Sequence, residues 1–236
     1  MGIAVNLTET AWGYELKTEE ITILFGAMKA QTADLRKAFP DLKLTRLKQI
    51  HSDAILETHP LSPDYEILGD AHWTKAKNLA LGVITADCVP VFLFDSKTKI
   101  IAGIHAGWRG VASKIIPKTI EKLSAQSSAP QDLQVFIGPH IQKNSFEIGI
   151  DVRDQILSSL GPLSPDERHE YFDDISKDKV LLDLHKVVLT QLNQSGVSPE
   201  NTHSLYIDTV KDSRFHSYRR DKEKAGRQVS FICRTS

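Results

Sequence analysis

The 236-residue sequence is poor in cysteine and carries no excess of charge of either sign. It has only two cysteines, Cys88 and Cys233, which argues against a fold held by disulfides and indicates a reducing compartment. Its formal net charge is −1, which gives no electrostatic signature for binding nucleic acid or an acidic membrane. We therefore expect no nucleic-acid and no membrane partner, and the composition leaves the oligomeric state open.

Long apolar runs and several well-known motifs are also missing. No run reaches the roughly 20 apolar residues that cross a bilayer. Residues 1–20 show no basic segment followed by an apolar stretch, so no signal peptide is visible and we expect a cytoplasmic protein. The sequence lacks GxGxxG and P-loop motifs, which excludes nucleotide binding by those two devices. The GxSxG motif of serine hydrolases is absent as well.

The composition that remains is that of an ordinary globular protein, with 41% hydrophobic and 25% charged residues. Apolar and β-branched runs predict strands over residues 44–58, 79–85, 134–138, 204–210 and 228–233, and hairpins over 12–26 and 89–104. Apolar spacing predicts helices over residues 28–39, 111–126, 151–160 and 183–195. Because strands outnumber helices and often join as hairpins, we expect an α+β (mixed α/β) fold: one domain over residues 1–236, with mixed β-sheets flanked by helices.

Three finer expectations concern helix ends and loops. Asp151 is the expected N-cap of its helix, and Pro117 either kinks the helix over residues 111–126 or begins a new one. The polar stretch over residues 164–180 is expected to be the most weakly packed, and the basic segment 214–227 to be a solvated loop.

The most informative feature is a cysteine and a histidine at the two ends of one predicted hairpin. Cys88 precedes the apolar run 89–94, and His105 follows the run 99–104. If Ser96 and Lys97 are the central turn residues, paired positions sum to 193 and Cys88 faces His105. Facing Cβ atoms in such a pair are roughly 5 Å apart, within reach of one shared metal ion or proton. The alternative is a buried cysteine beside a structural histidine.

A catalytic zinc site needs a third ligand beside these two and an open fourth position. His51 is the best candidate, because it lies in the polar cluster 49–53 within a strand-like run. His72 and His140 are reserve ligands or substrate contacts, near predicted strand ends. The remaining loop histidines are expected to be solvated: His59, His169 and His203.

The segment Gly107–Gly110 places an arginine between two glycines, next to His105. Glycines suit a tight strand-to-helix turn at which backbone and side chain approach an anion. Arg109 is therefore a candidate for binding phosphate or carboxylate in a forked geometry. For Trp108 we favour a place in the core.

Six motifs together resemble one known family: QIHSD (49–53), GDA (69–71), TADCVPV (85–91), HAGWRG (105–110), IGPHI (137–141) and FHSYRR with GR (215–220, 226–227). The chain is identified by them as a member of the laccase-domain family. That family is also called multicopper polyphenol oxidoreductase or polyphenol oxidase, and some bacterial members are described as peptidoglycan editing factors. The resemblance covers residues 22–233.

The resemblance implies a fold, a metal site and an activity. The fold is a single α/β domain similar to the catalytic domain of cytotoxic necrotising factor. The metal site is a His-Cys-His set that maps onto His51, Cys88 and His105, with zinc as the metal. The activity is phosphorolysis of adenosine, inosine and methylthioadenosine by inorganic phosphate, together with adenosine deamination.

Roles follow for other residues of these motifs. Arg109 is the first candidate for phosphate, with Lys48, Arg219 and Arg220 behind it. Asp87 or Asp70 is expected to orient water or carry a proton. The expected substrate-binding residues are Gln49, Asp70, Arg109 and His140.

The sequence also departs from the family pattern. The segment 25–39 is shortened, which removes an expected phosphate or ribose contact. His140 stands at the place of the family's usual cysteine, and Asp208-Thr209 at that of its late Cys-Thr pair. These departures leave the choice of substrate open.

Three other functions stay open at this point. A cysteine hydrolase acting on peptidoglycan precursors would use Cys88 as nucleophile and His105 as base, without metal. A multicopper oxidase needs His-x-His pairs, and no two of the nine histidines are separated by one residue; copper bound at the zinc site is compatible with the ligands. A non-catalytic metal-binding module needs a fourth protein ligand, and the sequence offers no convincing one.

Overall fold

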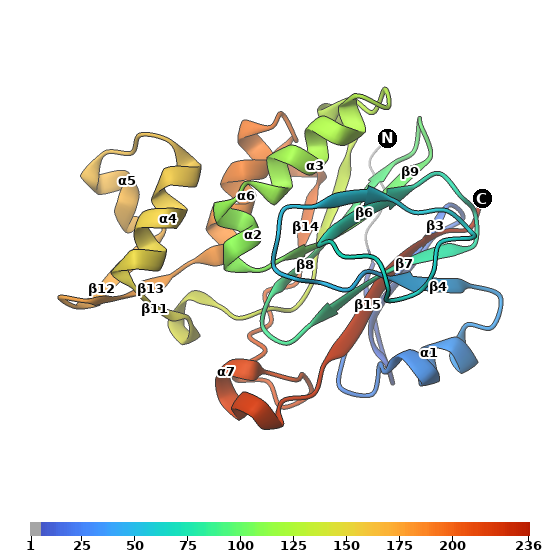
Figure 1. Cartoon of the computed structure of the whole chain (residues 1–236), viewed down its shortest axis with the longest axis horizontal. Helices are drawn as coiled ribbons and strands as arrows, with labels where there is room; N and C mark the ends of the chain where they lie inside the picture. Colours follow the sequence, from blue (N-terminus) through green and yellow to red (C-terminus); the bar gives the residue numbers. More distant parts are fainter. Residues whose placement is uncertain (1–5) are drawn as a thin grey trace.

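Two six-stranded sheets packed face to face form the centre of the computed structural model, which describes residues 6–236 (Figure 1). Residues 1–5, the start of the stretch in which we expect no signal peptide, lie outside the described residues. The first sheet has the order β1 (Thr8–Thr10), β2 (Gly13–Lys17), β3 (Ile21–Gly26), β15 (Gln228–Arg234), β7 (Leu79–Thr85), β4 (Lys43–Arg46). The second has the order β14 (Thr202–Ser204), β10 (Gln134–Ile137), β8 (Val89–Asp95), β9 (Ile100–Ala106), β6 (Ala71–Thr74), β5 (Ile55–Glu57).

Both sheets are mixed, as the sequence predicts. The pairs β4–β7, β5–β6 and β10–β14 are parallel, and the other pairs of these two sheets are antiparallel. A third, three-stranded sheet consists of β11 (Glu147–Gly149), β13 (Lys179–Leu182) and β12 (Phe172–Ser176). It projects to one side of the molecule with the helices α4 (Ile150–Leu160) and α5 (Pro165–His169) (Figure 1).

Helices cover the outer faces of the two central sheets. The second sheet is covered by α2 (Trp108–Ala112), α3 (Ile115–Ser124) and α6 (Leu184–Gln194), and the first by α1 (Thr32–Ala38). Helix α4 packs against α2, α6 and the third sheet. The two remaining α-helices are α5 (Pro165–His169) and α7 (Tyr218–Asp221), and short 3₁₀ turns span Pro130–Asp132, Lys143–Ser145, Pro199–Asn201 and Lys222–Lys224. None of the helices in the described part of the chain is long and apolar enough to span a bilayer.

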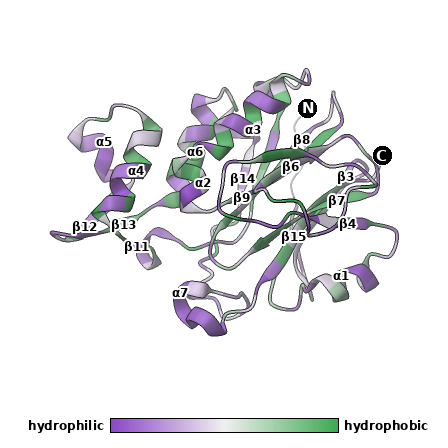
Figure 2. Cartoon of the chain, viewed as in Figure 1, coloured by the Kyte–Doolittle hydropathy of each residue, from purple (hydrophilic) through white to green (hydrophobic). Residues whose placement is uncertain are grey.

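Strict alternation of side chains along the central strands creates these layers. In β8, Val91 and Leu93 pack toward the helices, whereas Phe92 and Phe94 pack toward the first sheet. Phe92 stacks there on Phe25 of β3, with ring centroids 5.4 Å apart. Figure 2 shows the result, with hydrophobic residues along the central strands and hydrophilic ones on α5 and α7. A strand buried on both faces explains why β8 is apolar at nearly every position.

Most of the predicted elements are confirmed. The hairpin over 12–26 is β2–β3, and the strands over 79–85, 134–138 and 228–233 are β7, β10 and β15. The predicted helices over 28–39, 151–160 and 183–195 correspond to α1, α4 and α6, and the predicted segment 111–126 contains α3 and the end of α2. Pro117 lies in the first turn of α3, so it marks a new helix rather than a kink. Most side chains of the polar stretch 164–180 are exposed, in line with the expected weak packing, although a capping box at Ser164 begins α5 and the β12–β13 hairpin follows.

Two predicted elements and one cap are wrong. The expected strand over 204–210 is reduced to β14, which ends at Ser204. The N-cap of α4 is Gly149, and Asp151 lies in the first turn, where its charge still favours the positive end of the helix. The expected strand over 44–58 is interrupted between β4 and β5, because the amides of residues 50–52 donate to a side chain instead of a neighbouring strand.

The predicted register of the β8–β9 hairpin is also wrong, by two residues. Asp95 accepts hydrogen bonds from the amides of Lys97 and Thr98, and Lys99 adopts a left-handed conformation with φ 60°. These features lengthen the turn, so Pro90 rather than Cys88 faces His105. A shift of two residues keeps every side chain on its face, and Cys88 is therefore a diagonal neighbour of His105.

Candidate metal and substrate site

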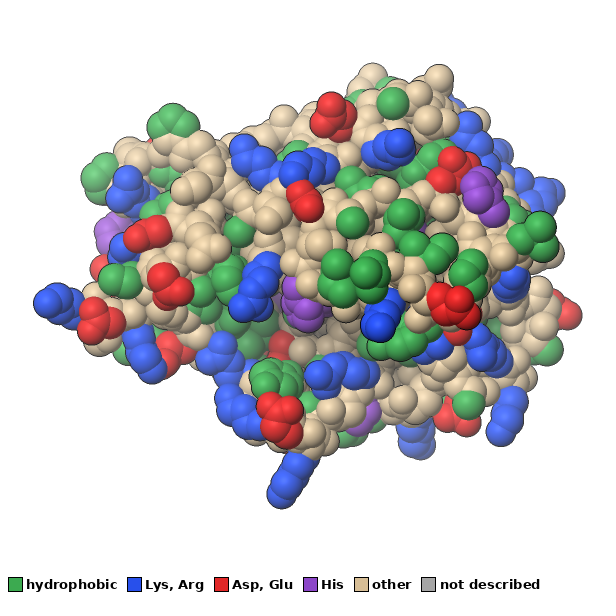
Figure 3. All heavy atoms as spheres, in the orientation of Figure 1, with side chains coloured by type: hydrophobic (Ala, Val, Ile, Leu, Met, Phe, Trp, Pro, Cys, Tyr) green, Lys and Arg blue, Asp and Glu red, His purple; other side chains and the backbone are tan. Residues whose placement is uncertain are grey.

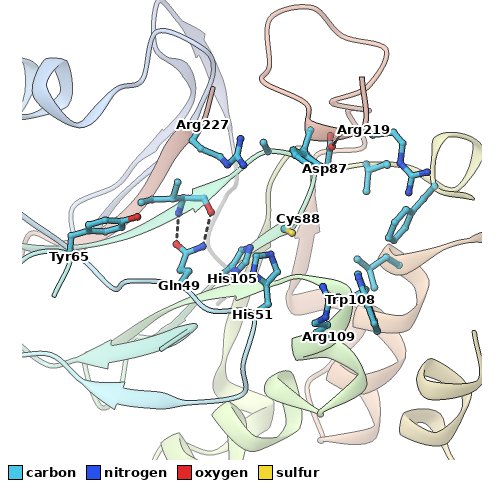
Figure 4. A pocket seen from close by; sticks show the side chains of 16 residues that line it. Gln49, His51, Tyr65, Asp87, Cys88, His105, Trp108, Arg109, Arg219 and Arg227 are labelled. Carbon is cyan, nitrogen blue, oxygen red and sulfur yellow. Dashed lines mark hydrogen bonds between the residues drawn. The ribbon is translucent and has the colours of Figure 1, made fainter. Parts of the chain in front are cut away.

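The candidate site lies at one end of the space between the two central sheets. There β7 and β9 end, β8 and β15 begin, and α2 starts after Gly107. A cavity of about 660 Å³ opens at this end of the molecule (Figure 4). Figure 3 shows the hollow on the surface, with a histidine at its edge and basic side chains around it.

Three side chains predicted as metal ligands meet on the wall of this cavity. The donor atoms of His51, Cys88 and His105 all lie within 4.8 Å of one another. His51 comes from the segment between β4 and β5, Cys88 from the residue before β8, and His105 from β9. The two imidazole rings meet edge to face, with centroids 4.9 Å apart. Exposure decreases from His51, which is exposed, through Cys88 to the buried His105.

A buried carboxylate, that of Asp70, holds two of these segments together. Its Oδ1 accepts hydrogen bonds from Nδ1 of His105 at 2.8 Å and from the amide of His51 at 3.0 Å. Its Oδ2 accepts from the amide of Ile50 at 3.2 Å and from the amide and hydroxyl of Ser52 at 2.7 and 2.8 Å. The side chain is 0% exposed. Asp70 therefore lies behind the ligands and does not line the cavity.

The charges of the metal-free site reinforce one another. Burial alone would raise the pKa of the Cys88 thiol, but His105 and His51 beside it lower that pKa to about 6. Burial likewise would lower the pKa of His105, but the Cys88 thiolate and the Asp70 carboxylate raise it to about 9. Without metal, the side chains thus form a thiolate–imidazolium pair at neutral pH.

Gly107 leaves the space that a shared ion needs. A Cβ atom at this position would lie 3.1 Å from Sγ of Cys88, 3.1 Å from Cδ2 of His51 and 3.7 Å from Cε1 of His105. The backbone conformation is extended, with φ −73°, so the glycine is required for space rather than for its torsion angles. The three donors therefore converge on a point that is kept free of side chains.

This donor set fits zinc. One thiolate and two imidazoles are ligands that zinc prefers, and three protein ligands leave a position for a substrate. Because Nδ1 of His105 is held by Asp70, Nε2 is the atom free to bind metal. In the part of the chain that the structure describes, this is the one group of three such side chains close enough to share an ion.

The other walls of the cavity are aromatic and basic. Three arginines line it, and each guanidinium lies over an aromatic ring: Arg109 over Trp108 at 4.4 Å, Arg219 over Phe146 at 5.4 Å and Arg227 over Tyr218 at 5.7 Å. Arg219 also donates to the carbonyl of Glu147, and Arg227 to carbonyls of its own loop. Trp108 was expected in the core; it packs against the core with one side and lines the cavity with the other.

Two more predicted residues line the cavity but have their polar atoms occupied. The amide of Gln49 pairs with the backbone of Ile84, donating to its carbonyl at 2.7 Å and accepting from its N–H at 2.8 Å. The carboxylate of Asp87 accepts from the hydroxyl of Thr209 at 2.7 Å and from the amide of Arg219 at 2.6 Å. Asp87 has φ 87°, a strained value that these contacts maintain.

Besides Asp70, three predicted residues do not line the cavity. His140 is fully buried; it donates to the carbonyl of Gly138 and contacts His185 at 3.2 Å. The guanidinium of Arg220 is held by backbone carbonyls of residues 209–215 and by Asp221. Lys48 is exposed beside the cavity rather than in it.

The sequence reasoning missed several cavity residues, namely Tyr65, Phe146, Leu184, Tyr218 and Arg227. Tyr218 and Arg227 belong to the basic segment that we expected to be a solvated loop. In the structure, α7 folds back over the cavity because Asp87 accepts the amide of Arg219. The FHSYRR and GR motifs do place arginines close to an aromatic residue in the sequence, which is a signal for a binding role. Nothing in this segment, however, indicates that it packs over the cavity.

Comparison with known proteins places the chain in a family. Residues 27–235 match the family described as multi-copper polyphenol oxidoreductase laccase. A curated protein of Clostridium acetobutylicum named purine nucleoside phosphorylase is 37% identical over 79% of this chain and 75% of its own length. A protein of the same name from Pseudomonas aeruginosa is 28% identical over 79% of this chain and 72% of its own length.

Solved structures share the fold. The hypothetical protein YfiH of Bacillus licheniformis superposes with a TM-score of 0.81, covering 90% of this chain and 92% of that one, at 24% identity. YlmD of Geobacillus stearothermophilus superposes with a TM-score of 0.79, covering 92% and 91%, also at 24% identity. At this identity the likeness concerns the arrangement of the elements.

Proposed function

The chain belongs to the multi-copper polyphenol oxidoreductase laccase family, and from this membership we propose that it is a purine nucleoside phosphorylase. The reaction breaks the bond between the base and C1′ of adenosine, inosine or methylthioadenosine. Phosphate oxygen forms the new bond to C1′, which gives the free base and a sugar 1-phosphate. The reaction class is taken from the name of the curated relatives. The side chains that line the cavity suit the binding of phosphate and a planar base.

One observation carries the proposal: an arginine with free donors shares a cavity with the His-Cys-His group (Figure 4). Among the described residues no carboxylate pairs with Arg109, whose guanidinium only stacks on Trp108. Phosphate is the anion that a free guanidinium fork fits best. Arg109 is therefore assigned to phosphate, and the faces of Trp108, Phe146 and Tyr218 to the planar base.

The proposed metal is zinc, held by His51, Cys88 and His105. Zinc in this position would supply a Lewis acid beside the bound nucleoside. The protein's own residues orient the reactants: Arg109 holds phosphate, and the aromatic walls exclude water from the base. Asp70 and Asp87 have both carboxylate oxygens engaged by donors, so we assign them to positioning rather than to proton transfer.

We extend the proposal to adenosine deamination at the same site: water, in place of phosphate, attacks C6 of the base, the bond from C6 to the exocyclic nitrogen breaks, and ammonia leaves, which gives inosine. Incubating the zinc-loaded protein with adenosine, with and without phosphate, separates the two reactions. Adenine that forms only with phosphate supports phosphorolysis, and inosine in both samples supports deamination. No product in either sample would contradict both.

Removing the thiolate is the sharpest test of the metal site. Cys88→Ala should lose zinc and turnover together, because two histidines alone bind zinc weakly. Cys233→Ala is the matched control, since Cys233 is buried in the core beneath α1 and far from the cavity. Zinc content by atomic absorption and product formation are measured on both variants. A Cys88→Ala protein with normal activity would refute the scheme.

One observation favours a second function, that of a cysteine hydrolase. Asp70, His105 and Cys88 stand in the order carboxylate, imidazole and thiol, which is the order of a nucleophilic triad. Labelling by iodoacetamide distinguishes the two functions. A zinc-bound Cys88 is protected until a chelator is added, whereas a free nucleophile reacts at once.

Copper is the third possibility, suggested by the family's description. Copper would take the same three ligands, because it binds most zinc sites more tightly than zinc does. The one ligand group found in residues 6–236 holds one ion, which does not suffice for a multicopper cluster. We therefore propose zinc as the working metal.

A further inference from the structure

The geometry points to Asp70 as the residue that positions the metal site, a role that rests on the proposed function. We infer that this single carboxylate fixes the rotation and tautomer of His105 and, at the same time, the backbone that presents His51. A second-sphere residue of this kind acts through the ligands and touches neither metal nor substrate.

The hold on His105 is twofold. The side-chain Nδ1–H donates to the Asp70 carboxylate at 2.8 Å, and the backbone amide of His105 donates to the Asp70 carbonyl at 2.7 Å. An ionised carboxylate can only accept hydrogen bonds, so Nδ1 of His105 carries the proton. The lone pair of the neutral ring is then at Nε2, on the side of Cys88. The ring is buried and cannot turn freely.

The hold on His51 acts through the backbone. His51 has φ 58°, a left-handed conformation that a non-glycine residue seldom adopts. Three successive amides, those of Ile50, His51 and Ser52, converge on the Asp70 carboxylate and offset this strain. On the other side, Gln49 ties the same segment to Ile84 of β7. The loop is thereby fixed before any metal binds.

The hydrogen bonds that Asp70 accepts exclude the role that the sequence suggested for it, which was to orient water or carry a proton. Five donors occupy the two oxygens of Asp70, and the side chain is shielded from the cavity. A proton carrier needs a free lone pair within reach of the substrate. Asp70 has no access to the cavity, so its contribution is to hold the two histidines in place.

The test is Asp70→Asn, which keeps the shape but replaces one acceptor oxygen by an N–H donor. In the place of Oδ1 that donor faces Nδ1 of His105 and the amide of His51, and in the place of Oδ2 it faces the amides of Ile50 and Ser52, so in either orientation part of the hold on the histidines is lost. Zinc affinity of the purified protein, measured by competition with a chromophoric chelator, should fall roughly 10- to 100-fold. Absorption of the cobalt-substituted protein should change as well, since it reports the geometry of the ligands.

Asp95→Asn is the matched control. Asp95 is as deeply buried as Asp70 and accepts hydrogen bonds from backbone amides and two hydroxyls. It lies at the turn of the β8–β9 hairpin, at the end away from Cys88 and His105. If Asp70 contributed only to folding, both variants would bind zinc alike when folded. We expect the Asp95→Asn protein to keep the zinc affinity and the cobalt spectrum of the unmodified protein.

Two results would overturn the inference, and neither depends on the assay of activity. The first is a folded Asp70→Asn protein with unchanged zinc affinity. The second uses Ser52→Ala, which is milder and removes one hydroxyl donor from Asp70; zinc affinity should fall severalfold, and no change would count against the inference even if Asp70→Asn does not fold. Failure of the unmodified protein to bind zinc would instead refute the proposed metal site itself.

Discussion

At the scale of single residues, the polar side chains nearest the site serve two different purposes. Cys88, His51 and His105 present free donor atoms to one point. Asp70, Asp87 and Gln49 have their polar atoms bonded to the backbone or side chains that carry the site. A carboxylate close to a reactive group is therefore a catalytic acid or base only if its lone pairs are free, and a list of nearby residues does not show this.

Gly107 gives the residue-scale prediction. Gly107→Ala should weaken zinc binding by roughly tenfold, because the new methyl group would lie 3.1 Å from Sγ of Cys88 and from Cδ2 of His51. The backbone at this position suits alanine, so the melting temperature of the zinc-free protein should hardly change. Chelator competition and thermal unfolding of the zinc-free protein check both parts. An unchanged zinc affinity would show that the ion binds elsewhere.

At the scale of elements, the site depends on where strands stop. The β8–β9 hairpin brings Cys88 and His105 to one end of the sandwich, and the interruption between β4 and β5 adds His51. Beneath the cavity, the end of β10 leads to His140, which packs against His185 of α6 with nearly parallel rings, 5.0 Å apart. These two imidazoles connect the second sheet to its helical layer.

Acid should weaken this connection. Burial, with the neighbouring His185, lowers the pKa of His140 from 6.5 to about 4, and burial lowers the pKa of His185 to about 4. The hydrogen bond to the Gly138 carbonyl and the carboxylates of Asp183 and Asp208 oppose the shift of His140 only in part. Between pH 6.5 and 4 the unfolded chain binds protons that the folded chain does not, so stability is complete above pH 6.5 and is lost as the pH falls toward 4.

The measurement compares His140→Asn with the unmodified protein in urea unfolding at pH 7 and pH 5. Asparagine keeps a donor for the Gly138 carbonyl but does not titrate. The unmodified protein should lose more free energy of unfolding between the two pH values than the variant, by up to about 2 kcal/mol. Equal losses would mean that His140 is protonated in the folded protein.

At the scale of the whole molecule, the candidate site lies where the two sheets, the helical layer and α7 meet (Figure 1). The three ligands come from segments separated by up to 54 positions in the chain, from His51 to His105. A metal held by all three binds only the folded chain, because the unfolded chain does not bring them together.

Zinc should therefore stabilise the whole fold. At a free zinc concentration about a hundredfold above Kd, the gain is about 2.7 kcal/mol. For a chain of this length that raises the melting temperature by roughly 5–10 °C. Differential scanning calorimetry with and without zinc tests this, and Cys88→Ala should show no shift. A shift of the same size in that variant would place the binding outside the proposed site.

The sequence by itself determined the mixed α+β class, most of the central strands and helices, and the three side chains that the structure brings together as candidate ligands. It could do so because periodicity and β-branched runs report burial locally, and because the ligands stand in distinctive motifs. Predictions from the sequence were wrong where a contact between distant segments overrides the local pattern. The strand over 44–58 breaks because Asp70, some 20 residues later, takes its amides, and the hairpin register follows from how Asp95 caps its turn.

Only the tertiary structure decided which polar groups are free and which walls enclose the cavity. From the sequence we expected Tyr218 and Arg227 to lie in a solvated loop, whereas in the structure Asp87 accepts the amide of Arg219 and holds α7 over the cavity. We also expected Asp70 to orient water or carry a proton, whereas five donors occupy its carboxylate. Hydrogen bonds between segments far apart in the chain leave no periodic trace in the sequence. The ligands of this site were thus visible in the sequence, whereas the residues that hold them in place were not.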